Sequence, residues 1–182
     1  MRFIHFALAC LLCSVLTTSW AQERVPDKDL ILKAAADIIK RVPNCALITL
    51  DEMGQPQART MDPFPPEENF VTWFGTNRNS RKVSEIKNDP RVSIYYGEAS
   101  GNGYVVLAGA AVLVDDSIAK EKYWKEKWER FYPDRKATYL LIKVIPKMLE
   151  VVSYEHGLTG DTITWRAPNI NYSLKKQQTH NK

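Results

Sequence analysis

The sequence predicts an α+β protein built on an antiparallel β-barrel of six or seven strands with flanking helices. Short segments rich in β-branched and aromatic residues recur along the chain, separated by turns of Gly, Pro and Asn. Segments with helical spacing occur near the start, in the middle and before the last strands. Because helices and strands do not alternate, a parallel sheet is disfavoured. The 182 residues suit one domain.

The first half of the chain supplies a helix and three strands. A helix is expected over residues 27–42, with Asp27 as its N-cap and Pro43 closing it. Residues 45–50 and 56–61 read as a hairpin, and residues 69–75 as a third strand. The proline-dense link between the second and third strands is expected to be a surface loop.

The second half continues with a short helix over residues 80–88 and further strands. Gly109 is expected to form a bend or bulge in the long strand that contains it. The spacing over residues 117–133 predicts one amphipathic helix with Trp124, Trp128 and Phe131 on one face. We expect this face to pack in the core rather than to contact a cofactor. The remaining strands are expected over residues 91–97, 104–115, 138–146, 147–154 and, more weakly, 161–166. Residues 167–182 are expected to form a polar flexible tail.

Residues 1–21 have the pattern of a secretory signal peptide. They contain an early Arg2, an apolar run and a small residue, Ala21, at the end. The run is shorter than the ~20 residues that span a membrane. We therefore expect cleavage after about Ala21 and a periplasmic or secreted protein without membrane attachment. Lipid attachment at Cys10 or Cys13 is a weaker alternative, because both cysteines interrupt the apolar run.

The mature chain offers few groups for metal or hydrolytic chemistry. Cys45 is its one cysteine, so no intramolecular disulfide can form, and we expect a buried thiol rather than a reactive one. Its two histidines, His156 and His180, do not form a zinc pattern, and no nucleophile-elbow pattern is present. With 24 basic and 21 acidic residues left, the net charge of +3 does not indicate a nucleic-acid partner.

A cluster of cations at the start of the short central helix is the most informative feature. Arg78, Arg81 and Lys82 lie where the helix dipole disfavours positive charge. Together with backbone N–H groups and the hydroxyls of Thr76 and Ser80, they suit a phosphate group. The alternative is an ordinary polar helix start on the protein surface.

The segment FGTNRNSRKVSEIKNDPRVSIYY, residues 74–96, resembles pyridoxamine 5'-phosphate oxidase-like proteins. It matches their pattern of a strand, a Thr-Asn turn, a Ser-Arg-Lys helix start and Asn-Pro-Arg-Val. The order of elements from about residue 27 to residue 154 also matches the split barrel of that family. The resemblance implies an FMN-binding split-barrel domain over residues 22–166, closest to the general stress protein branch.

Members of that family bind FMN at a dimer interface, so the resemblance implies a homodimer with a flavin site. The strand residues Arg59, Thr60 and Met61 would lie along the flavin, with Gly75 and Thr76 near its ring and phosphate. The phosphate would be held by the helix start, Ser80, Arg81 and Lys82, and Tyr104 would reach the flavin across the dimer. The alternatives are a solvated strand residue for Arg59 and an ordinary barrel-wall aromatic for Tyr104.

The resemblance implies an exported flavin-dependent oxidoreductase that acts on an unassigned small molecule. It is not a true pyridoxamine phosphate oxidase, because the Arg-x-His motif of those enzymes is missing; Trp165 and Arg166 stand in for at most part of it. No catalytic residue stands out. The alternatives are a non-catalytic flavin carrier or sensor, a deazaflavin such as F420 in place of FMN, and a haem-binding or haem-degrading protein with His156 or His180 as axial ligand.

Overall fold

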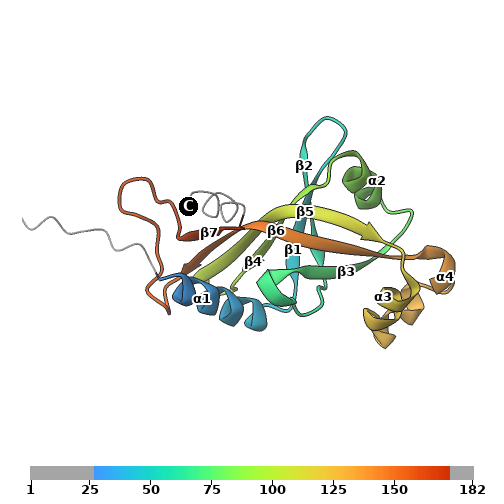
Figure 1. The fold of residues 1–182 in the computed structure, drawn as a ribbon, viewed down its shortest axis with the longest axis horizontal. Helices are drawn as coiled ribbons and strands as arrows, with labels where there is room; N and C mark the ends of the chain where they lie inside the picture. The colour runs from blue at the N-terminus through green and yellow to red at the C-terminus, as the bar shows by residue number, and fades with distance from the viewer. Residues whose placement is uncertain (1–26, 173–182) are drawn as a thin grey trace, which may run out of the picture.

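The computed structural model describes residues 27–172, which form a single antiparallel sheet with short flanking helices (Figure 1). The strands follow the order β2-β1-β4-β5-β6-β3, and β7 pairs with β6. The sheet is curled into a half-barrel, which confirms the predicted α+β split barrel. The strands are β1 (Cys45–Leu50), β2 (Pro56–Met61), β3 (Thr72–Asn77), β4 (Arg91–Gly97), β5 (Gly103–Val114), β6 (Tyr139–Ser153) and β7 (Asn169–Asn171).

The helices are short apart from the first. They are α1 (Lys28–Arg41), η1 (Glu68–Phe70), α2 (Arg81–Asn88), α3 (Ser117–Lys122), η2 (Glu126–Phe131) and α4 (Arg135–Thr138). Asp27 caps α1, as predicted, by accepting a hydrogen bond from the N–H of Asp29. The apolar face of α1 packs against β4, β5, β6 and β7 (Figure 1). Among residues 27–172, no helix is long and apolar enough to span a membrane.

The long strands β5 and β6 form the spine of the sheet. Their register shifts between Ala108 and Gly109, so the bulge predicted at Gly109 is confirmed. A side chain at Gly109 would overlap the backbone of Ile145 and Pro146 on β6. The segments 138–146 and 147–154, predicted as two strands, are one continuous strand, β6.

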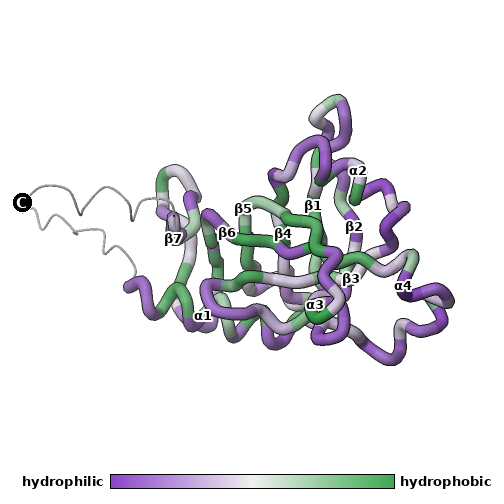
Figure 2. Tube along the Cα trace, turned by 45° about the vertical axis from the view of Figure 1, so that its right-hand side comes forward, coloured by the Kyte–Doolittle hydropathy of each residue, from purple (hydrophilic) through white to green (hydrophobic). Residues whose placement is uncertain are grey.

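Two hydrophobic clusters stabilise the fold. The larger one lies between α1 and the central strands, which are mostly hydrophobic in Figure 2, and it includes Cys45. Burial raises the pKa of the Cys45 thiol to about 12, which confirms the expectation of an inert, buried cysteine. The smaller cluster is aromatic and consists of Phe64, Trp73, Tyr123, Tyr139 and Leu141, with Trp124 and Trp128 packed against it.

The prediction of one helix over residues 117–133 is wrong. Helix α3 stops after Lys122, because the carbonyl oxygen of Tyr123 accepts a hydrogen bond from the Tyr139 hydroxyl instead of continuing a helical ladder. Trp124 packs edge-on against Tyr139 at 5.1 Å between ring centroids, whereas Phe131 is 59% exposed. Tertiary packing around Tyr139 therefore overrides the helical spacing.

The predicted end of the domain also needs correction. Residues 161–166 form a turn rather than a strand, because the Asp161 carboxylate accepts hydrogen bonds from the N–H groups of Ile163, Thr164 and Arg166. The predicted tail starts too early, since residues 169–171 form β7 and pair with β6. Residues 173–182 of that tail and the predicted signal peptide, residues 1–21, lie outside the described residues.

A buried carboxylate, Glu85, fastens α2 to the β1–β2 hairpin. Its side chain is 4% exposed. Glu85 Oε2 accepts a hydrogen bond from the Thr49 hydroxyl and another from Arg59 Nη2 at 2.8 Å. Glu85 Oε1 lies 2.9 Å from Arg81 Nε. Burial acts to raise the pKa of Glu85, but the bond from Thr49 and the charges of Arg59 and Arg81 outweigh it and hold the pKa below its usual range.

We predict that Gly109→Val lowers the free energy of unfolding by about 2–3 kcal/mol, because its side chain would collide with the β6 backbone. Ala58→Val, at an exposed position on β2, is the control and should change the stability by less than about 0.5 kcal/mol. Urea denaturation followed by tryptophan fluorescence measures both. Equal stability of the two variants would show that the bulge does not need glycine.

We predict that Glu85→Gln lowers stability at pH 7 by about 3 kcal/mol, because it leaves the Arg59 guanidinium without its charged partner. The folded-state pKa of Glu85 is below its ordinary value of 4.5, so the carboxylate stabilises the fold fully above pH 4.5. That contribution is lost as the pH falls through the folded-state pKa. The stability difference between wild type and variant should therefore shrink in acid. A constant difference down to about pH 2 would contradict this account.

Candidate functional site

A cavity of about 350 Å³ opens where β2 and β3, the two ends of the sheet, meet; we call it the seam cavity. It brings together five of the nine residues predicted for a flavin site: Thr60, Met61, Gly75, Thr76 and Lys82. Its other lining residues are Asp62, Asn77, Trp128, Phe131 and Tyr132. The sequence prediction therefore identified about half of the wall.

Lys82 supplies the positive charge inside the seam cavity. It lies in the first turn of α2, and its ammonium group donates to the Thr76 hydroxyl at 3.2 Å. The Thr76 hydroxyl also lies 3.1 Å from the hydroxyl of Ser80. Ser80 occupies the N-cap position of α2 but makes no capping bond. These three residues thus gather at the helix start, as predicted from the sequence.

The electrostatic surroundings of Lys82 favour an anion beside it. Burial lowers the pKa of Lys82, and the positive charges of Arg59 and Arg81 lower it further, while Glu85 acts in the opposite direction. The ammonium form is therefore less stable here than in water. A negatively charged ligand in the seam cavity would restore that stability.

Arg59 and Arg81 lie beside the seam cavity and do not line it. The side chain of Arg59 is 18% exposed and that of Arg81 is 72% exposed, and both pair with Glu85. Arg81 Nη2 also donates to Gln57 Oε1 at 3.3 Å. Glu85 thus holds two guanidinium groups next to Lys82. Arg78, by contrast, pairs with Asp115 at 2.5 Å and contributes nothing to the cavity wall.

Three aromatic side chains line the seam cavity together with Lys82, and the sequence did not predict them as part of the site. Trp128, Phe131 and Tyr132 come from η2 and the residue after it. Trp128 lies directly over Gly75, where any side chain would overlap its ring, so a glycine is needed there. The density of aromatic residues between positions 123 and 132 was the available signal. The core packing predicted for this stretch is confirmed for Trp124 and Trp128, which pack against the smaller hydrophobic cluster, whereas Phe131 is exposed.

Asp62 also lines the seam cavity, but its carboxylate is occupied. It lies 2.6 Å from Lys125 Nζ and 2.8 Å from Lys127 Nζ. Burial acts to raise the pKa of Asp62, and the hydrogen bonds from the two lysines hold it below its usual range. Asp62 is therefore a charged structural group near neutral pH rather than a proton donor.

Tyr104 lies away from the seam cavity of its own chain. It is paired with Gly97 and Val152 in the sheet, and its hydroxyl donates to Glu150 Oε1 at 3.2 Å. Its ring stacks on Tyr95 with 5.7 Å between centroids. The contact expected from Tyr104 crosses a dimer, so it stays a prediction.

The other candidate ligands lie outside the seam cavity as well. Both ring nitrogens of His156 are engaged, Nδ1 with Ser153 Oγ at 2.9 Å and Nε2 with Asp37 Oδ2 at 3.0 Å. His156 therefore cannot bind a haem iron as an axial ligand without losing one of these bonds. His180 lies outside the described residues. Trp165 and Arg166 are exposed in the turn after β6.

Known proteins with related sequences and folds agree with this architecture. The family model described as pyridoxamine 5'-phosphate oxidase like matches residues 32–161. General stress protein 26 of Bacillus subtilis is 31% identical over 94 residues, which span 50% of this chain and 66% of that protein.

Two solved structures extend the comparison. General stress protein 26 from Bacillus anthracis is 28% identical, with a TM-score of 0.57 over 66% of this chain and 92% of that one. A haem-binding protein from Mycobacterium smegmatis, 16% identical with a TM-score of 0.59 over 81% of this chain and 59% of that one, shares the fold. Since the family model covers more than half of the sequence, the chain belongs to the pyridoxamine 5'-phosphate oxidase-like family.

Proposed function

We propose that this protein binds FMN in the seam cavity and acts as an exported, homodimeric flavin-dependent oxidoreductase on an unassigned small molecule. The observation that carries the proposal is Lys82, a partly buried cation in a cavity with an aromatic wall. Membership of the family supports it, as does the similarity to general stress protein 26. The predicted signal peptide supports export.

The residues at the start of α2 fit the phosphate of FMN. The Lys82 ammonium group faces the cavity, and the hydroxyls of Thr76 and Ser80 are within hydrogen-bonding distance of each other at its edge. Arg81 is largely exposed, so its guanidinium can turn towards a phosphate after giving up one ion pair with Glu85. Charge-assisted bonds to a phosphate contribute about 1.5–3 kcal/mol each, and Glu85 keeps its bonds from Thr49 and Arg59 when Arg81 turns away.

The aromatic lining of the seam cavity fits a flat ring system. Trp128, Phe131 and Tyr132 offer aromatic faces and edges, and Thr60 and Met61 line the β2 side. Tyr104 would reach the flavin from the second chain of the dimer, as the family resemblance implies.

When bound, the flavin would supply the redox chemistry, and the protein would bind it, orient it and limit its contact with water. Lys82 would hold the phosphate end, and the aromatic residues would fix the plane of the ring. Asp62 keeps Lys125 and Lys127 in place at the cavity edge. We assign no general acid or base to this chain.

Three alternatives lead to different measurements. A flavin carrier or sensor would bind FMN without turnover, so NADH or NADPH would not bleach the bound flavin. In an oxidoreductase, the flavin would be bleached and then reoxidised by air. F420 would compete with FMN for the same cavity. Haem would give a Soret band, and His156→Ala would abolish it only if His156 leaves Ser153 and Asp37 on binding.

We predict that Lys82→Ala weakens FMN binding at least about tenfold, because it removes a charge-assisted bond to the phosphate. Riboflavin lacks the phosphate, so its weaker affinity should change by less than about twofold. Flavin fluorescence quenching measures both dissociation constants on the same protein preparation.

Lys87→Ala is the matched control, because Lys87 is exposed in the last turn of the same helix. It should leave both affinities unchanged. Equal loss of FMN and riboflavin affinity in Lys82→Ala would mean that Lys82 does not contact the phosphate. Absence of FMN binding by the wild-type protein would overturn the proposed function itself.

A further inference from the structure

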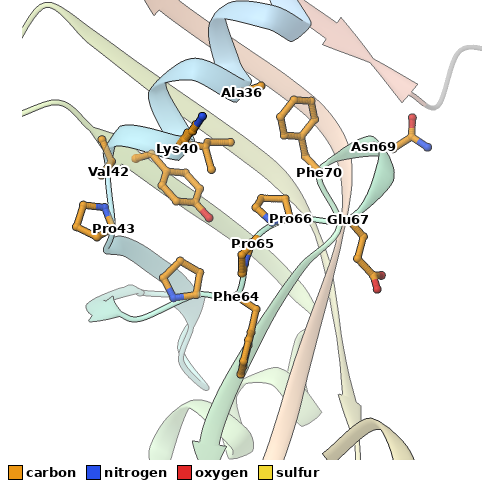
Figure 3. A pocket seen from close by; sticks show the side chains of 13 residues that line it. Ala36, Lys40, Val42, Pro43, Phe64, Pro65, Pro66, Glu67, Asn69 and Phe70 are labelled. Carbon is orange, nitrogen blue, oxygen red and sulfur yellow. The ribbon is translucent and has the colours of Figure 1, made fainter. Parts of the chain in front are cut away.

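A second cavity, of about 520 Å³, lies between the C-terminal half of α1 and the loop that joins β2 to β3 (Figure 3). We call it the α1 cavity. None of its lining residues lines the seam cavity. Most of them are apolar: Ala36, Ile39, Val42, Pro43, Pro63, Phe64, Pro65, Pro66 and Phe70, together with Lys40, Glu67, Asn69 and Tyr96.

The two cavities lie on opposite sides of one short stretch of chain. Asp62 lines the seam cavity and Pro63 lines the α1 cavity. Next along the chain, the N–H of Phe64 donates to the carbonyl oxygen of Trp73 at 2.9 Å, which ties the β2–β3 loop to β3. The Phe64 ring packs edge-on against Trp128, 5.5 Å between centroids. This wall separates the α1 cavity from the candidate flavin site.

The unpaired charge on the lining of the α1 cavity is positive. Lys40 is exposed in the last turn of α1 and forms no ion pair with any residue between 27 and 172. Glu67 also lines the cavity, but its carboxylate accepts hydrogen bonds from Trp73 Nε1 at 3.1 Å, Lys122 Nζ at 3.0 Å and the Tyr123 hydroxyl. Figure 3 shows its carboxylate directed away from the other lining side chains.

Tyr96 adds a buried hydroxyl to the mostly apolar lining. Its side chain is completely buried, and its hydroxyl, near Thr72 and Cys45, makes no hydrogen bond of normal geometry. The Thr72 hydroxyl donates instead to the Phe70 carbonyl oxygen at 3.0 Å.

The loop wall is held in an unusual backbone conformation. Asn69 and Phe70 have φ angles of 56° and 60°, in the left-handed region that a bulky residue such as phenylalanine rarely adopts. Phe70 nevertheless packs against the main hydrophobic cluster and lines the cavity. The packing of Phe70 therefore keeps the cavity wall in place.

We propose that the α1 cavity is a second binding site, for a flat apolar molecule that carries one anionic group. The prolines and aromatic side chains would contact the apolar body, and Lys40 would pair with the anion. The proposal does not depend on flavin binding, because the two cavities share no lining residue.

The test uses two probes of nearly equal shape, of which one is charged. 1-Anilinonaphthalene-8-sulfonate has an aromatic body and a sulfonate, and N-phenyl-1-naphthylamine has the same body without the sulfonate. Ala36→Trp fills the cavity from an exposed position on α1 and should weaken both probes at least about tenfold. Lys40→Glu should weaken the charged probe about fivefold or more and change the neutral one less than about twofold.

Lys28→Glu, an exposed lysine at the other end of α1, is the charge control and should leave both probes unchanged. Lys82→Ala should also leave them unchanged, whether or not FMN binds, so failure of the flavin proposal would be seen separately. Wild-type affinity in Ala36→Trp, or displacement of the probes by FMN, would overturn the proposal. A probe affinity that falls as the protein associates at higher concentration would also overturn the proposal, since a second copy would then cover the cavity.

Discussion

The arrangement of the candidate site depends on one buried carboxylate. Glu85 is surrounded by Thr49, Arg59 and Arg81, and it ties α2 to the β1–β2 hairpin. Lys82 is three residues before Glu85, so both lie on the same side of α2. Because Glu85 fixes that side against the sheet, Lys82 is held at the seam cavity. The cluster of cations that opposes the helix dipole is thus partly neutralised from within the protein.

The internal neutralisation changes the interpretation of the sequence motif. From the sequence, three cations at a helix start indicated an external anion. In the structure, Arg78 pairs with Asp115, and Arg59 and Arg81 pair with Glu85, so Lys82 is the cation that faces the cavity. A phosphate would add to this network and compete with Glu85 for Arg81. The site is therefore more preorganised, and less strongly positive, than the motif indicates.

Much of the fold could be predicted from the sequence, because local patterns decide it. The strand bounds at β1, β2 and β4 agree with alternation and turn residues, and Gly109 marks the bulge. The prediction of one helix over residues 117–133 is wrong because the hydroxyl of Tyr139, which is distant in sequence, donates a hydrogen bond to the carbonyl oxygen of Tyr123.

The candidate site could be predicted only in part, for the same reason. Its β2, β3 and α2 residues lie in a motif that can be recognised in the sequence, whereas Trp128, Phe131 and Tyr132 reach the cavity through tertiary packing. The α1 cavity has no motif, since it arises where the β2–β3 connection crosses from one end of the sheet to the other past the end of α1.

The most direct measurement is a crystal structure of the protein grown with FMN. The account predicts the phosphate within about 3 Å of Lys82 Nζ and the flavin ring next to Trp128, with Glu85 still bonded to Arg59. A flavin bound elsewhere, or a phosphate that contacts neither Lys82 nor the hydroxyls of Thr76 and Ser80, would contradict it.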